Sequence, residues 1–293
     1  MTAVLDWKHL DYSDPKTEQW IRDQDFIPEP VADALLADES RPRAVRFEDG
    51  VLVILRGVNL NPGSSVEDMV SIRIWLDSER AISTSRRQLR SVEALQAQLE
   101  KTGAAMTPGE FLLSLAARLG DYMSEAIEQI ENDLEQAEDK IQDCKTIDRN
   151  SPFSKIRRQV ARIRRYVAPQ REALDHLSRS GLASFSVEEL TGFHEETNRL
   201  TLTLENLDLV RERAMVAQEE FLALLAHEQN ARMLLLSIIA AVFLPLSFLT
   251  GLMGMNVAGL PGTVSPEAFW IVSFIMLAIA AGIMGLLRRR GWL

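Results

Sequence analysis

The chain has 293 residues, of which 25% are charged and 46% hydrophobic, and its formal net charge is −10. A protein made mostly of membrane spans would carry fewer charges, so this composition predicts a sizeable soluble part with a short membrane-embedded part. The acidic charge argues against nucleic-acid binding and favours the handling of cations. The single cysteine, Cys144, cannot form an internal disulfide, which suits a cytoplasmic domain.

Residues 1–106 are expected to form a cytoplasmic α/β domain. Asp14 followed by proline, and later Pro28, are typical of helix starts, because proline fits the first helical turn. Two apolar runs on either side of residues 48–50 predict a β-hairpin. A strand whose alternating pattern would bury one face, a further strand and a last helix are predicted at residues 70–76, 81–85 and 91–103.

Residues 107–232 are expected to form a cytoplasmic helical hairpin and stalk. A capping box at 107–110 predicts a helix that runs to about residue 148. A second helix is expected from residue 151 to about 181, with a kink or break at Pro169. A second capping box at 186–189 then precedes apolar residues spaced by three, four and seven. This pattern predicts one helix from residue 187 to 253, with a break near Gly192 or Glu228 as the alternative.

The two helices of the predicted hairpin carry opposite charge. Residues 121–148 are strongly acidic and residues 155–171 strongly basic. One interpretation is that neighbouring helices neutralise each other. The other is that the acidic face gathers cations while the basic face modulates access near the membrane surface.

Two apolar runs near the C-terminus, 233–255 and 269–287, predict transmembrane helices. Neither contains a charged residue, and at 1.5 Å per residue they reach about 34 and 28 Å, close to the thickness of a bilayer core. The loop at 256–268 has no basic residue, whereas Arg232 precedes the first run and a basic tail at 288–293 follows the second. The positive-inside rule therefore predicts both termini in the cytoplasm and the loop outside. A buried helix pair in a soluble protein is disfavoured, because soluble helices rarely stay uncharged this long.

One face of the first run carries a narrow stripe of polar, thioether and small side chains. Its members are three, four or seven residues apart: Asn230, Met233, Ser237, Leu244, Ser247, Gly251 and Gly254. Two spans per chain cannot enclose a hydrophilic path, so a transport role requires an oligomer. A small-residue face for helix packing is the alternative.

Residues 243–256, which read FLPLSFLTGLMGMN, closely resemble the pore helix of the CorA divalent-cation transporter family. The family's Gly-Met-Asn motif falls at Gly254, Met255 and Asn256. The tail RRRGWL and the two-span ending extend the resemblance over most of the chain. The segments LRGVNLNPG, EDM and VAGLPG, at 55–63, 67–69 and 257–262, resemble the ZntB zinc-transporter branch.

The resemblance implies a funnel-shaped homopentamer in the lipid bilayer of a bacterial-type inner membrane, with five first spans around a pore. The implied pore-lining residues are Asn230, Met233, Ser237, Leu244 and Ser247, and the implied external ion-recognition residues are Gly254, Met255 and Asn256. The expected cargo is Zn²⁺, with Cd²⁺, Ni²⁺ and Co²⁺ as further candidates and proton coupling left open. A Mg²⁺ channel gated by cytoplasmic Mg²⁺ is the alternative. No resident cofactor is expected.

No other motif competes with a transport function. The four histidines and Cys144 are scattered, without the spacing of a zinc site. His227 lies three residues before Asn230, so it is either a pore-entrance group or an ordinary stalk histidine. There is no nucleotide-binding GxxxxGK[ST] loop and no catalytic constellation, so we expect a transporter and not an enzyme. A membrane-tethered coiled-coil scaffold is the remaining alternative.

Overall fold

The computed structural model describes residues 5–291 apart from 104, 143–151, 181–184, 257–259, 261 and 263–264. Cys144 and six of the thirteen residues of the predicted external loop lie outside the described residues. The chain divides into two compact units, Met1–Glu219 and Glu220–Leu293.

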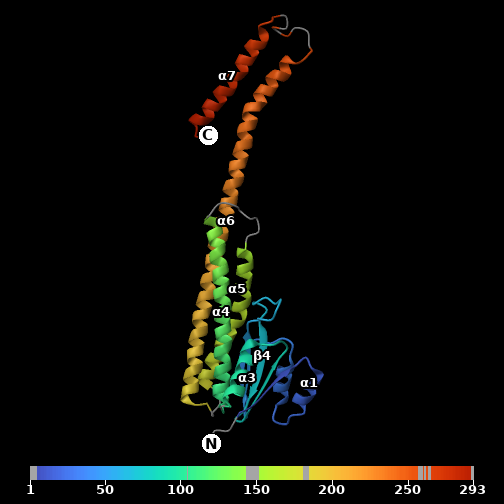
Figure 1. Cartoon of the computed structure of the whole chain (residues 1–293), viewed down its shortest axis with the longest axis vertical. Coiled ribbons are helices and arrows are strands. Elements are labelled where there is room, and N and C mark those ends of the chain that lie inside the picture. Colours follow the sequence, from blue (N-terminus) through green and yellow to red (C-terminus); the bar gives the residue numbers. More distant parts are fainter. Residues whose placement is uncertain are drawn as a thin grey trace. The chain divides into compact units, whose positions relative to one another are not determined.

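A five-stranded sheet forms the centre of the first unit (Figure 1). Its order is β1-β5-β4-β3-β2, in which β2 to β5 are antiparallel neighbours and β1 pairs in parallel with β5. The strands are β1 (Asp6–Asp11), β2 (Arg43–Arg46), β3 (Val51–Gly57), β4 (Val70–Leu76) and β5 (Arg80–Ser85). The predicted hairpin and the two later strands are confirmed, whereas β1 was not predicted.

Helices cover both faces of this sheet. On one face, α1 (Pro15–Arg22) and α2 (Glu29–Leu36) enclose a core in which Leu35 packs with Ile54 and Trp75. On the other face, α4 (Pro108–Gln142) and α5 (Phe153–Ser180) contact β3, and the amide of Arg56 donates to Gln170 Oε1 of α5 at 2.7 Å. Strand β4 is therefore buried on both faces, and the prediction that it buries only one was wrong.

The long helices run without the breaks that the sequence analysis had considered for them. Helix α3 (Arg90–Thr102) leads to α4. Of the kink or break predicted at Pro169, the break is wrong, because α5 runs through this residue, and the kink stays a prediction. Helix α6 extends from Val187 to Met253 without a break at Gly192 or Glu228, as the periodicity predicted. Helix α7 (Ala268–Arg289) is the last helix among the described residues.

Both predicted capping boxes are present, and one carboxylate joins them. The amide of Thr107 donates to Glu110 at 2.9 Å, and that of Ser186 donates to Glu189 Oε2 at 2.6 Å. The buried carboxylate of Glu189 also accepts from the Glu110 amide at 3.0 Å and from the Thr107 hydroxyl. Glu189 therefore caps its own helix α6 and the start of α4.

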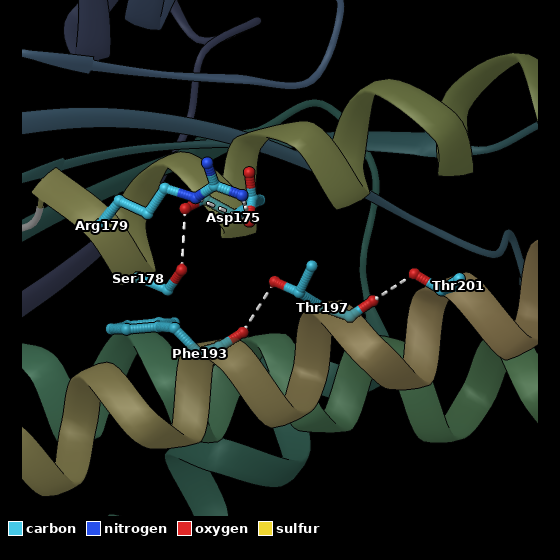
Figure 2. Close-up of polar contacts among 6 residues, drawn as sticks. All are labelled: Asp175, Ser178, Arg179, Phe193, Thr197 and Thr201. Carbon is cyan, nitrogen blue, oxygen red and sulfur yellow. Dashed lines mark hydrogen bonds and ion pairs between the residues drawn. The ribbon is translucent and has the colours of Figure 1, made fainter.

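The predicted apolar stripe of α6 is buried within the first unit from Phe193 through Leu207 to Ala217. Threonines between these positions satisfy their hydroxyls within the helix. Figure 2 shows Thr197 donating to the Phe193 carbonyl at 2.8 Å and Thr201 donating to the Thr197 carbonyl at 3.0 Å. These bonds allow hydroxyl side chains on a buried helix without unpaired donors.

Helix α6 also bridges the opposite charges of α4 and α5. Arg199 and Arg213 of α6 pair with Asp121 and Glu138 of α4, each at 2.5 Å. Arg164 of α5 pairs with an aspartate of α6 at 2.9 Å. Neutralisation of α4 by α5 itself stays a prediction, because these pairs each join one of the two helices to α6.

Candidate cation pathway

The Gly-Met-Asn motif directly follows the last residue of α6. The amide of Gly254 still donates to the Thr250 carbonyl at 2.9 Å, while that of Met255 reaches the Leu252 carbonyl at 3.5 Å. A Cβ on residue 254 would lie 3.1 Å from the Thr250 oxygen, so a larger residue here would require a small shift of that carbonyl. Met255 and Asn256 are both exposed beyond the helix end, so the amide of Asn256 is accessible.

The five predicted pore-lining residues share one face of α6. At 100° per residue they fall within an arc of about 100°, and the helix is continuous through all of them. Every one is exposed in the single chain, with Met233 at 65% and Leu244 at 72%. The Ser237 hydroxyl donates to the Met233 carbonyl at 2.9 Å, which leaves its oxygen lone pairs available. The structure thus brings Asn230, Met233, Ser237, Leu244 and Ser247 onto one exposed surface.

Pro245 leaves one backbone carbonyl oxygen beside this face without its helical hydrogen bond, a feature that was not predicted from the sequence. Proline has no N–H, so within α6 the carbonyl of Ala241 lacks its usual helical donor. Ala241 is four residues after Ser237 and three before Leu244, and therefore lies beside the same stripe. The sequence contains this signal, because Pro245 lies four residues after Ala241 and Ala241 lies next to the stripe.

The membrane candidates are exposed on all sides. In the described chain, α6 and α7 each contain an 18-residue window with mean hydropathy 2.4, and none of either window is buried. Apolar side chains are stable at such exposure only against lipid or other protein. The two predicted spans are therefore surfaces that need a bilayer, further copies of the chain, or both.

The described residues hold no cluster of three or more His, Cys, Asp or Glu that could bind a metal ion. His227 is exposed on α6, and its role stays a prediction. The ligands that the stripe offers are hydroxyl, amide and carbonyl oxygens. Such a set suits weak contacts with a passing hydrated cation better than a tight zinc site, which would use thiolate or imidazole ligands.

Comparison with known proteins decides the family. The chain matches the family described as CorA-like Mg²⁺ transporter protein over residues 2–289. This is a CorA-family protein. The CorA-family chain is 38% identical to the divalent cation transporter CmaX of Pseudomonas aeruginosa, over 99% of its own length and 90% of that relative. It is 32% identical to the zinc transport protein ZntB of Pectobacterium carotovorum, over 98% and 88% of the two chains.

Solved structures confirm the predicted fold class of this CorA-family protein. Full-length CmaX matches with a TM-score of 0.82 at 38% identity, covering 97% of this chain and 87% of that one. The complete CorA magnesium transporter of Methanocaldococcus jannaschii matches with a TM-score of 0.84 over 98% and 91% of the chains, and at 19% identity it shows the fold alone. The family predicted from Gly254, Met255 and Asn256 is thus confirmed, and with it a transporter rather than an enzyme.

Proposed function

We propose that this CorA-family protein carries divalent cations, chiefly Zn²⁺, along the axis of a homopentamer in a bacterial-type inner membrane. The observation that carries the proposal is the Gly254–Asn256 motif at the end of a continuous helix whose exposed stripe leads to it. The identity to ZntB and CmaX along almost the whole chain supports a transported divalent cation. Cd²⁺, Ni²⁺ and Co²⁺ prefer similar ligands and are further cargo candidates.

In this proposal, five Asn256 side chains and nearby carbonyls form the external mouth. Neutral oxygens can hold a hydrated cation without removing its water. Met233 and Leu244 form apolar constrictions that gate by dewetting, and Ser237, Ser247 and the Ala241 carbonyl supply oxygens between them. Asn230 forms a polar ring near the cytoplasmic end.

The direction of the driving force follows from the orientation that we propose. Arg232 and the basic residues at 288–290 keep both termini in the cytoplasm. A divalent cation moving inward across 100 mV gains about 4.6 kcal/mol, twice the value for a single charge. Uptake therefore needs no further energy source. Whether protons are also coupled to transport is tested by measuring uptake with and without a pH gradient.

The test is uptake of Zn²⁺ and Mg²⁺ by proteoliposomes, with and without a pH gradient. We expect Zn²⁺ uptake in the native protein and at least a hundredfold loss in Asn256→Ala, with the oligomer intact by native mass spectrometry. Ser265→Ala, an exposed substitution in the predicted external loop, is the matched control and should transport normally. Retained uptake in Asn256→Ala would show that the motif is not part of the transport pathway. Absence of any cation flux in the native protein would refute transport.

A Mg²⁺ channel is the second candidate. The family is named for Mg²⁺, and the fold is that of an archaeal magnesium transporter. Under this alternative, Mg²⁺ uptake should be independent of the pH gradient and should stop at millimolar internal Mg²⁺. Zn²⁺ uptake that is indifferent to internal Mg²⁺ would decide against it.

A further inference from the structure

A basic pocket of about 590 Å³ lies within the first unit, between the segment that joins β3 to β4 and helix α5. Four arginines line it, against two carboxylates: Arg56, Arg87, Arg162 and Arg165 with Glu67 and Asp68. The pocket is therefore positively charged, although the chain as a whole has a net charge of −10. The four guanidinium groups outnumber the two carboxylates, and this excess of positive charge favours the binding of an anion.

Arg56 is fixed in this pocket by groups that do not neutralise it. Its guanidinium donates to the Met69 carbonyl at 2.9 Å and to the Ser40 carbonyl at 2.8 Å, and it stacks 4.1 Å from the ring centre of Tyr166. Burial lowers the pKa of Arg56 and the charges of Arg73 and Arg165 lower it further, while Tyr166 and Tyr12 raise it in part. An anion in the pocket would offset both effects.

The other three arginines are available as well. Arg162 reaches Asp68 at 3.5 Å, but both side chains are more than half exposed, so the pair contributes little. Neither Arg87 nor Arg165 has an ion pair within 4.0 Å in the part of the chain that the structure describes. Glu67 is occupied by a bond from Gln159 at 3.2 Å.

We propose that this pocket binds a soluble anion that bears a pyrophosphate group, such as a nucleoside diphosphate. The planar fork of arginine matches phosphate oxygens with two parallel hydrogen bonds, and several forks can hold two linked phosphates. The volume falls within the range of roughly 300–1,000 Å³ found for small-ligand sites. This binding site goes beyond the proposed transport function, and its test does not depend on flux.

The test is calorimetric titration of the full-length protein in detergent with pyrophosphate and with ADP, in buffer free of divalent cations. Arg165→Gln and Arg87→Gln should each weaken binding at least tenfold. Asp68→Asn should tighten it severalfold, because it removes a negative charge from the lining of the pocket. Arg158→Gln removes an exposed arginine of the same helix that does not line the pocket, so this control should bind as the native protein does.

Several outcomes would overturn the proposal. One is no binding of pyrophosphate or ADP at millimolar concentration. Another is equal weakening of binding in Arg158→Gln and Arg165→Gln, which would show that binding depends on the overall charge of the protein and not on this pocket. Short-chain phosphatidic acid, titrated in parallel, offers the same chemistry from a lipid, and its binding without that of pyrophosphate or ADP would also refute a soluble ligand.

Discussion

Among single residues, His9 shows how burial decides the chemistry of a side chain that the sequence leaves ambiguous. Its ring lies on β1 with Nδ1 2.8 Å from the Ser83 hydroxyl and Nε2 3.2 Å from the Ser85 hydroxyl. Burial lowers its pKa to about 4, and the nearby charge of Asp11 offsets only part of this effect. At neutral pH His9 is therefore an uncharged structural group of the sheet.

This environment predicts a stability that falls in mild acid. In the unfolded chain a histidine takes up a proton near pH 6.5, whereas folded His9 does so only near pH 4. The unfolded state therefore binds more protons between these values, and the free energy of unfolding should decrease by about 3 kcal/mol as pH falls through this window. The measurement is the midpoint of thermal unfolding, followed by tryptophan fluorescence, at pH 7 and pH 4.5.

Two variants test the assignment to His9. His9→Asn should lower the midpoint at pH 7 and make it less sensitive to pH. His194→Asn, at an exposed position of α6, should keep the native pH dependence. An unchanged pH slope in His9→Asn would show that another group is responsible.

Among elements, the sequence predicts those whose stabilising contacts are close along the chain. The capping boxes, the hairpin and the periodic stripe of α6 follow from neighbours within seven residues. Strand β1 was missed because its partner β5 is 74 residues away and its own side chains are exposed or half-buried. The kink or break at Pro169 was predicted from local chemistry alone, whereas α5 is continuous there and also packs on β2 and β3, contacts that are distant in the sequence.

The same distinction applies to the candidate sites. Helical periodicity is enough to bring Asn230, Ser237 and Ser247 to one face of α6. The basic pocket could not be predicted, because Arg56, Arg87 and Arg165 come from three separate segments and meet only in the folded unit. The basic segment at residues 155–171 indicated a positive charge along α5 as a whole, but it did not indicate where on α5 the pocket lies.

The cap shared by α4 and α6 predicts an unequal response of two adjacent glutamates. Glu189→Ala leaves the Glu110 amide and the Thr107 hydroxyl without this buried acceptor, and should destabilise the first unit by about 2 kcal/mol. Glu188→Ala changes an exposed acid of the same helical turn and should cost much less. Denaturant unfolding, followed by circular dichroism, measures both.

Gly109→Ala provides an independent check of this cap. A Cβ at residue 109 would collide with the Glu189 carboxylate, so the alanine should destabilise the unit although it favours a helix elsewhere. A stabilised Gly109→Ala variant would contradict the shared cap.

On the scale of the whole molecule, α6 is apolar on two faces. One face is buried within the first unit, as Phe193 and Leu207 show. The other carries Leu202, Leu209 and Val216, which are spaced by seven residues and are each more than half exposed. Heptad spacing of exposed apolar side chains is typical of helices that pack against further helices. In the homopentamer that we propose, this stripe is an interface between copies.

Leu209→Lys is therefore expected to dissociate the oligomer without unfolding the first unit, because Leu209 makes no contribution to the buried core. Native mass spectrometry of the full-length protein should show five copies for the native chain and smaller species for the variant. Leu209→Met keeps an apolar side chain and should remain pentameric. An intact pentamer in Leu209→Lys would exclude this stripe from the interface.

The parallel pairing of β1 with β5 has a consequence for synthesis of the protein. Residue 6 leaves the ribosome 74 residues before its partner at position 80, an interval of roughly 4–15 s at about 5–20 residues per second. During this time the antiparallel strands β2, β3 and β4 can pair with their immediate neighbours, because only short connections separate them. Among the described strands, the first to be made is thus the one that waits longest for its partner, which it joins at an edge of the sheet.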